Sequence, residues 1–246
     1  MRGLGTLVNV AAVIVGGLIG LLCKGGLKER YRQTLMQACG LATIFIGAAG
    51  AFQMIFTINE QGRLSSGYTM LIVVSLVLGG LLGELINIEH GLDSLGEKLK
   101  KAVKRSGDSR FVDGFVTASL VTCVGAMAIC GPLDEALTGN SQTLFVKSIL
   151  DMVIVAVFAS VYGVGAIFSA LPIAVYQGFF TVFAGLIKPF MSDHLIMTLS
   201  GVGSVLIFAV GLNLISPKKI KVGNLLPALL IPVVYELLRL IPGFPL

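Results

Sequence analysis

The sequence predicts an all-α protein, a bundle of about eight transmembrane helices that forms one integral membrane domain over residues 1–246. Of its residues, 55% are hydrophobic and only 13% are charged, whereas soluble domains carry about 25% charged residues. The mean hydropathy is +0.93. The apolar residues also form separate runs, each near the roughly 20 residues that a helix needs to cross a bilayer.

Eight such runs are long enough to span a membrane. They are predicted at residues 4–23, 34–56, 68–88, 111–130, 144–168, 171–190, 194–215 and 225–241. No cleavage site sets the first run apart, so we expect it to be a retained span. The last run is short and contains Pro227, Pro232, Glu236 and Arg239. Seven spans with a re-entrant or interfacial C-terminus is therefore the alternative.

The loop charges predict the topology. If the loop at 24–33 is cytoplasmic and the sides then alternate, cytoplasmic segments hold most of the cations: Lys24, Lys28, Arg30, Arg32, Lys98, Lys100, Lys101, Lys104, Arg105, Arg110, Lys218, Lys219 and Lys221. The opposite side holds Arg2, Arg63, Lys188 and Arg239. This bias follows the positive-inside rule and predicts that both termini lie outside the cytoplasm.

The segment at 88–110 is predicted to be a cytoplasmic amphipathic helix. Leu92, Leu95, Leu99 and Val103 recur at helical spacing among lysines. Such a helix typically lies at the anionic inner leaflet of the lipid bilayer. Docking of a protein partner is the alternative.

The 31 glycines indicate close helix packing. Gly16-Gly17-Leu-Ile-Gly20 and Gly79-Gly80-Leu-Leu-Gly83 repeat one pattern. Packing explains it, whether inside one chain or between subunits of a homo-oligomer. Internal duplication is the alternative. The string Gly17-Leu-Ile recurs as Gly185-Leu-Ile, and if spans 6 to 8 are a copy of spans 1 to 3, the two copies would form a weak inverted repeat.

Two ionisable residues, Lys147 and Asp151, lie one helical turn apart in the run at 144–168. A charge at the centre of a membrane costs about 2.5 to 3.5 kcal/mol on insertion scales. Asp151 is predicted about 10 Å deep, at 1.5 Å per residue, and should face protein or water. Lys147 lies nearer the outer end and could snorkel towards it. The pair is either a local structural ion pair, or an ion or proton site in which Lys147 keeps Asp151 ionised.

Other polar residues in the runs could complete a binding site for a small ion or solute. Asn9 and Gln177 are the strongest candidates because apolar residues flank both; the others are Ser119, Thr122 and Asn213. In the alternative interpretation, each side chain forms a hydrogen bond between helices, which contributes about 0.6 kcal/mol.

Helix breaks are predicted at Gly125, at Gly131-Pro132, and at Gly163 with Gly165. Broken helices can point backbone groups into a site, although Pro132 could simply end its span. Asp134 and Glu135 are expected in the following loop, as a solvated and acidic outer mouth.

We expect no enzyme activity and no cofactor or metal, since HExxH, GxSxG and Walker motifs are absent from the sequence. Cys23, Cys39, Cys123 and Cys130 are expected to be reduced packing residues, with a redox or soft-metal site at Cys123 and Cys130 as the alternative. The net charge of +5 follows the spans rather than a surface patch, so we expect no nucleic-acid partner.

Several strings together resemble a known family: Gly5-Thr-Leu-Val-Asn9, Gly83-Glu-Leu-Ile-Asn-Ile-Glu89, Gly114-Phe-Val-Thr-Ala-Ser-Leu120, Cys123-Val-Gly-Ala-Met-Ala-Ile129, Lys147-Ser-Ile-Leu-Asp151, Tyr176-Gln-Gly178 and Asn224-Leu-Leu-Pro227. They resemble the bacterial proteins known as domain of unknown function 554, the YqgA-like family, from end to end. The resemblance implies a polytopic inner-membrane protein, loosely labelled a transporter, and supplies no substrate or site residue.

Three functions are therefore expected in order of preference. The first is an ion-coupled secondary transporter of a small ion or solute, because no ATP site is present and the polar residues lie within spans. The second is an ion channel, and the third is a non-transporting scaffold that acts through the segment at 88–110.

Overall fold

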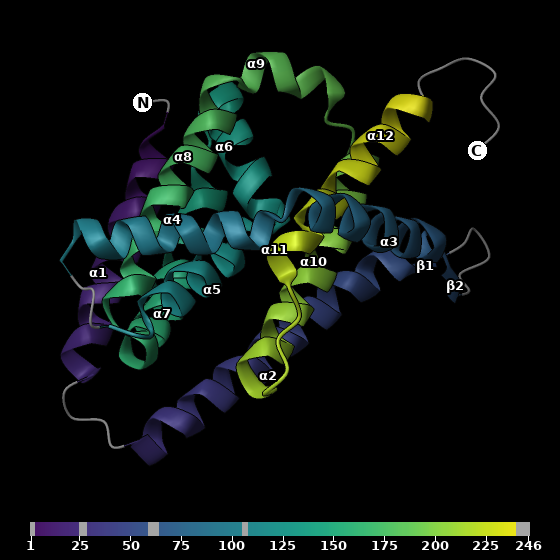
Figure 1. The fold of residues 1–246 in the computed structure, drawn as a ribbon. Helices are drawn as coiled ribbons and strands as arrows, with labels where there is room; N and C mark the ends of the chain where they lie inside the picture. The colour runs from purple at the N-terminus through teal and green to yellow at the C-terminus, as the bar shows by residue number, and fades with distance from the viewer. Residues whose placement is uncertain (1–2, 25–28, 59–63, 105–107, 240–246) are drawn as a thin grey trace.

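The computed structural model describes residues 3–24, 29–58, 64–104 and 108–239, which form a helical bundle (Figure 1). Arg2, Lys28, Arg63 and Arg105 of the topology prediction lie outside these residues. The elements are α1 (Leu4–Lys24), α2 (Glu29–Ile55), β1 (Phe56–Ile58), β2 (Leu64–Ser66), α3 (Thr69–Ile86), α4 (Ile88–Ala102), α5 (Phe111–Cys123), α6 (Ala126–Thr138), α7 (Gln142–Tyr162), the 3-10 turn η1 (Val164–Ser169), α8 (Ala170–Val182), α9 (Ala184–Ile187), η2 (Lys188–Phe190), α10 (Asp193–Ile215), α11 (Val222–Leu225), η3 (Leu226–Leu229) and α12 (Leu230–Arg239).

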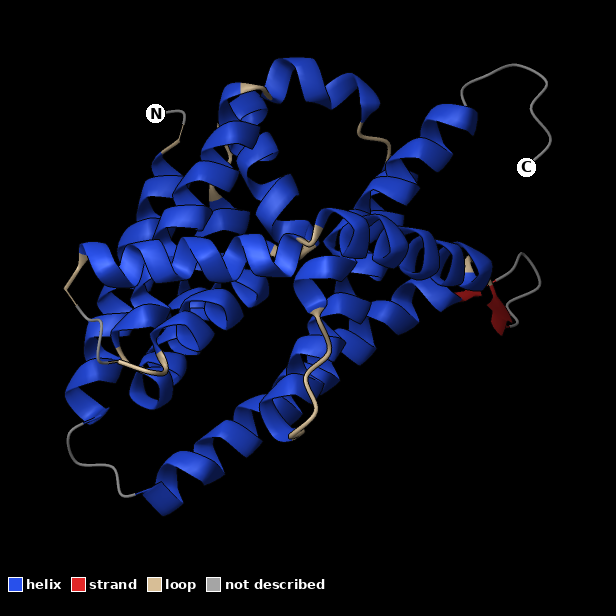
Figure 2. Cartoon of the chain, viewed as in Figure 1, coloured by secondary structure: helices blue, strands red, loops and turns tan. Residues whose placement is uncertain are grey.

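The prediction of an all-α transmembrane bundle is confirmed. Within the described residues, seven helical segments are long and apolar enough to span a membrane, and there are eight if the bent pair α5–α6, with an angle of 55°, is one span. A short antiparallel hairpin, β1–β2, was not predicted and lies at one edge of the molecule (Figure 2). Its Phe-Thr-Ile strand consists of aromatic and β-branched residues, which favour extended backbone.

The direction of helix packing shows that α5–α6 counts as one full crossing. Helices α1 and α7 run parallel, because residue numbers rise together along their contact. A Cβ atom added to Gly5, Gly16 or Gly20 would contact Leu144, Met152 or Ala156, respectively. Helix α3 ends on the face that carries α4, and α7 starts on the opposite face, which carries α9. The chain between them must therefore cross once, which gives eight alternating spans and places Leu4 and Arg239 on the same face.

The glycine pattern serves close packing within the chain. A Cβ on Gly16 or Gly20 would overlap carbonyl oxygens of α7, and a Cβ on Gly79 or Gly83 would overlap the backbone of η3 or α11. Two helix axes can approach this closely only where no side chain intervenes.

The helices form two groups that Figure 1 shows on either side of the molecule. Group A contains α1, α5, α6, α7 and α8, and group B contains α2, α3, α10, α11, η3 and α12. Three apolar cavities of about 380, 380 and 560 Å³ lie at the seam between the groups, among the described residues. Each is lined from both sides, for example by Tyr176 of group A and Leu229 of group B. Helices also contact one another less across the seam than within either group.

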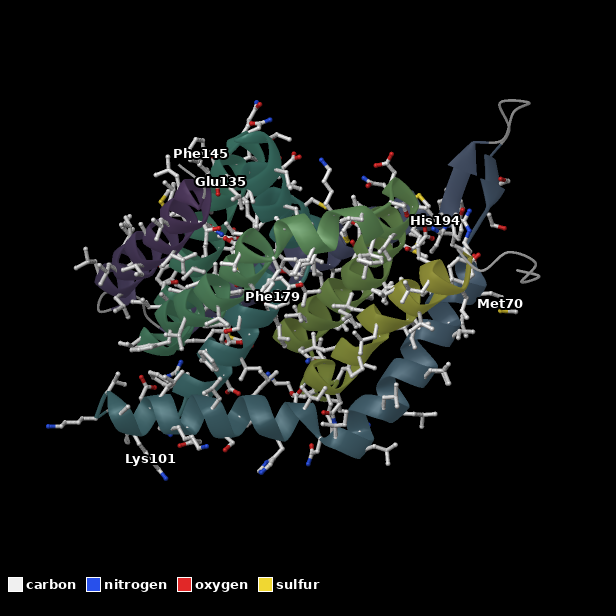
Figure 3. The ribbon with its side chains drawn as sticks, turned by 90° about the horizontal axis from the view of Figure 1, so that it is seen from above. Met70, Lys101, Glu135, Phe145, Phe179 and His194 are labelled. Carbon is white, nitrogen blue, oxygen red and sulfur yellow. The ribbon has the colours of Figure 1, made fainter. Side chains whose placement is uncertain are left out.

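Helix α4 runs across one face of the bundle, beneath both groups (Figure 3). Leu92, Leu99 and Val103 pack against the core around α5, and Gly96 lies against Val112 and Phe115. The segment predicted to be amphipathic is helical over Ile88–Ala102, and much of its apolar face covers the protein's own bundle rather than being free for the bilayer or a partner.

Hydrogen bonds fix the corner between α3 and α4. Asn87 takes the left-handed conformation (φ 57°) that asparagine tolerates, so α4 starts directly after α3. Asn224 accepts a hydrogen bond from the Glu89 backbone and donates one to Glu84, and Gly223 donates to Glu89. These bonds attach α11 to the corner. Burial raises the pKa of the Glu89 carboxyl, against the Gly223 hydrogen bond, which lowers it.

Several predicted boundaries were wrong. Helix α7 ends at Tyr162 rather than at 168, because Gly163 (φ 91°, ψ −149°) adopts a conformation open essentially only to glycine. Gly163 thus makes the turn between two spans, not a break within one. Pro132 does not end its span but lies inside α6.

The C-terminal span is anchored rather than loose. Ser192 and His194 at the start of α10 both bond to the Glu236 carboxylate of α12, His194 at 2.8 Å. These bonds attach α12 to the start of α10, and Val222–Arg239 is long and apolar enough to be a membrane span.

The inverted repeat stays a prediction. Helices α2 and α10 pack antiparallel, as do α3 and α11–η3, which are the pairs that such a repeat would relate. However, Gly17 packs against Ile167, whereas Gly185 has nothing within 4 Å of an added Cβ. The two Gly-Leu-Ile strings therefore occupy different environments.

Candidate functional site

Lys147 and Asp151 form a buried ion pair within group A. The Lys147 ammonium donates to both Asp151 carboxylate oxygens, at 2.9 and 2.7 Å. Their residues are 6% and 3% exposed. The prediction that Lys147 snorkels outwards is wrong, because its partners lie inside the bundle and satisfy the charge there.

The predicted break at Gly125 supplies the third partner of Lys147. Helix α5 ends at Cys123, and Gly125 (φ 155°) separates it from α6. The Thr122 carbonyl oxygen, near this helix end, accepts a hydrogen bond from the Lys147 ammonium at 2.8 Å. The partial negative charge of a helix C-terminus favours a cation at this position. All three ammonium protons now have acceptors.

Asn9 contacts the pair, and Gln177 lies on α8, which packs against α1. The Asn9 amide nitrogen donates to Asp151 at 3.0 Å. Val13 and Ile173 share one core cluster between α1 and α8, and Asn9 and Gln177 each lie one turn from them. Because α1 and α8 are antiparallel, Gln177 lies at the level of Asn9. It is 1% exposed.

Sequence reasoning missed Glu135 as a site residue. The predicted solvated loop is instead helical, since α6 continues to Thr138, and Glu135 is 0% exposed. Its Oε1 accepts hydrogen bonds from the Gly5 backbone at 2.6 Å and from Ser141 at 2.7 Å. Asp134 is exposed, as expected. The spacing of Ile129, Leu133 and Ala136 was the available signal, because it continues a helical apolar face past Pro132.

We define the polar cluster as six buried residues of group A: Thr6, Asn9, Glu135, Lys147, Asp151 and Gln177. Among the described residues, seven buried side-chain nitrogen and oxygen atoms make no hydrogen bond, and five of the seven belong to this cluster. They are Thr6 Oγ1, Asn9 Oδ1, Glu135 Oε2 and both amide atoms of Gln177. A buried polar atom without a partner costs about 1 to 3 kcal/mol, so such a concentration indicates a binding site.

Three predicted site residues do not join the cluster through their side chains. The Ser119 and Thr122 hydroxyls bond to carbonyls of their own helix, at Phe115 and Ala118. Asn213 binds both the N–H and the carbonyl of Ile220, which fixes the loop after α10. Only the Thr122 backbone takes part in the site.

A family model described as "Protein of unknown function (DUF554)" matches residues 4–237. The chain belongs to this family. It is 36% identical over 228 residues to "Uncharacterized membrane protein YdfK" of Bacillus subtilis (strain 168), covering 93% of each chain. It is 28% identical to "Uncharacterized protein YqgA" of Escherichia coli (strain K12), covering 93% of this chain and 94% of that one. No solved structure matches it.

The resemblance seen in the sequence is thus confirmed, and the chain is a membrane protein of the DUF554 family. Chemically, its polar cluster offers carboxylate, amide and hydroxyl groups inside an apolar bundle. These groups suit a proton or a small monovalent cation, which oxygen ligands bind without a cofactor.

Proposed function

We propose that this DUF554 protein is an ion-coupled secondary transporter of a small ion or solute, with Asp151 as its ion-binding carboxylate. The observation that carries the proposal is the buried Lys147–Asp151 pair, set in a cluster of polar atoms that the protein itself leaves unpartnered. Ionisable residues within membrane spans typically mark ion or substrate pathways.

The seam between the two helix groups supports alternating access. Rigid groups of helices that rock against each other are the common way to expose a central site to each side in turn. Cys123 and Tyr176 line a seam cavity, and their neighbours Thr122 and Gln177 belong to the site. Helices α5 and α8 therefore border both the polar cluster and the seam.

The proposed membrane is the cell inner membrane, with the α4 face in the cytoplasm. In the described residues that face carries most cations, including Lys100, Lys101 and Lys221, whereas the α9 face carries Lys188 and Arg239. Both termini would then lie outside the cytoplasm. The Lys147–Asp151 pair would lie nearer the outer side.

The scaffold alternative has less support, because α4 already packs Leu92, Leu99 and Val103 against its own bundle. A channel is the second candidate, since it would use the same polar groups. Flux that saturates with ion concentration favours a carrier, whereas a pore conducts without exchange.

We expect Asp151→Asn to abolish ion flux. Asparagine keeps a hydrogen-bond acceptor for Lys147 but carries no charge to bind a proton or cation. The measurement is the relaxation of an imposed pH or Na⁺ gradient in proteoliposomes that contain an internal pH dye.

Asp134→Asn is the matched control, because Asp134 is an exposed acid of the same bundle. If Asp151→Asn alone folds poorly, Lys147→Met/Asp151→Asn removes both charges and should be folded and inactive. Flux equal to wild type in a folded Asp151 variant would remove Asp151 from the mechanism.

A further inference from the structure

We infer that Glu135 is a second ion-binding carboxylate of the polar cluster and that the ion it holds is a proton. This inference rests on the proposed transport function and specifies its coupling ion. Glu135 lies against the outer end of α1 (Figure 3).

Helix α1 places Glu135 about one turn from the Lys147–Asp151 pair. Gly5 contacts Glu135 through its N–H, and Asn9 contacts Asp151 through its side chain. Four residues of α-helix rise about 6 Å. Glu135 therefore lies on the side of the pair nearer the α9 face, between the site and that surface.

Charge balance requires one further positive charge. Lys147 is the one cation of the cluster, and all its protons are used by Asp151 and by Thr122. An ionised Glu135 would therefore be a second buried carboxylate without a cationic side chain of its own among the described residues, with the Gly5 N–H at the start of α1 and the Ser141 hydroxyl as its partners. A bound proton removes this charge.

The two Glu135 oxygens fit this assignment. Oε1 accepts from Gly5 and from Ser141, whereas Oε2 is buried and makes no hydrogen bond within the described residues. A carboxylic acid has one oxygen that accepts and one that carries the proton. Oε2 is the position left for the proton.

The titratable groups on the elements packed against Glu135 are few. They are Lys147 and Asp151 on α7, Tyr176 on α8, Cys130 and Asp134 on α6 itself, and Asp193 and His194 at the start of α10. The described part of α1 brings none to this level. Among the described residues of these elements, Lys147 is thus the cation that could respond to a change at Glu135.

Proton exchange at Glu135 can couple to the ion pair through this lysine. When the Oε2–H bond breaks and the proton leaves towards the α9 face, the new carboxylate competes with Asp151 for the Lys147 ammonium. The flexible four-carbon stem of lysine allows this movement. Asp151 is then free to accept a cation, and reprotonation of Glu135 returns Lys147 to Asp151.

Infrared difference spectroscopy of the purified protein in lipid vesicles tests the inference without requiring transport. We expect a protonated-carboxyl C=O band in the wild-type protein at neutral pH. The band should disappear in Glu135→Gln and persist in Asp134→Asn. Glutamine retains an acceptor for Gly5 and Ser141, so the fold should be kept.

Absence of the band in wild type, or its persistence in folded Glu135→Gln, would overturn the inference. Because coupling is reciprocal, Na⁺ that binds at Asp151 should weaken the wild-type band at constant pH, and this effect should be absent in Asp151→Asn. Loss of the band on adding NaCl that persists in Asp151→Asn would show that Na⁺ replaces the proton at Glu135 itself, and would overturn the choice of ion. Failure of the transport proposal is distinguishable, because it would appear as absent flux while the Glu135 band remains.

Discussion

Replacing Lys147 by methionine is expected to lower the free energy of unfolding by about 3 to 5 kcal/mol, the usual cost of removing one partner of a buried pair. Methionine has a similar length but leaves the Asp151 charge with only the Asn9 amide as partner. The measurement is denaturant unfolding, or thermal unfolding, of the protein in detergent.

Two variants make this prediction specific. Lys147→Met/Asp151→Asn should recover most of the loss, because neither charge is then left buried. Lys221→Met breaks the bridge between Lys221 and Glu84, whose side chains are 60% and 58% exposed, and should cost less than about 1 kcal/mol. A loss for Lys147→Met no larger than that for Lys221→Met would contradict the buried pair.

Replacing Gly20 by alanine is expected to lower the free energy of unfolding by about 3 kcal/mol, the upper part of the range for overpacking. The new Cβ would overlap the Ala156 carbonyl oxygen of α7, and backbone cannot move aside as a side chain can. Helix α1 would have to separate from α7, the two helices that bring Asn9 to Asp151.

Gly178→Ala is the control for this substitution. Gly178 also lies within a helix, α8, but has nothing within 4 Å of an added Cβ. Alanine there should be neutral or stabilising, because it is the better helix former by about 1 kcal/mol. Equal losses for the two variants would show that the effect is not steric.

The sequence predicted the spans well because a bilayer leaves few options: long apolar runs must be helices. The ends of spans were harder. The run at 144–168 stays apolar across Gly163, so composition alone did not reveal that the chain turns there. The hairpin β1–β2 was missed because three-residue strands carry little pattern.

The site was predicted only in part. Lys147, Asp151, Asn9 and Gln177 could be found because a polar residue within an apolar run has few structural explanations. The role of the Thr122 carbonyl could not be found in this way, because backbone groups carry no residue signal. Glu135 was missed because Gly131-Pro132 indicated a loop, whereas neighbouring helices hold the chain helical through the proline.

The account brings these features into one arrangement. A broken helix and a lysine hold Asp151 inside group A, Glu135 lies on its outer side, and a seam separates group A from group B. Its central claim is that ion binding in the polar cluster drives transport.

Uphill movement in proteoliposomes tests this claim most directly. Vesicles with equal internal and external pH receive an outward gradient of Na⁺, of K⁺ or of a mixture of small amino acids, and the internal pH is followed with a dye. For wild type we expect at least one gradient to drive the internal pH away from equilibrium and then back, and Asp151→Asn to abolish this overshoot. An overshoot that persists in Asp151→Asn, or purely dissipative movement under every gradient, would contradict the account.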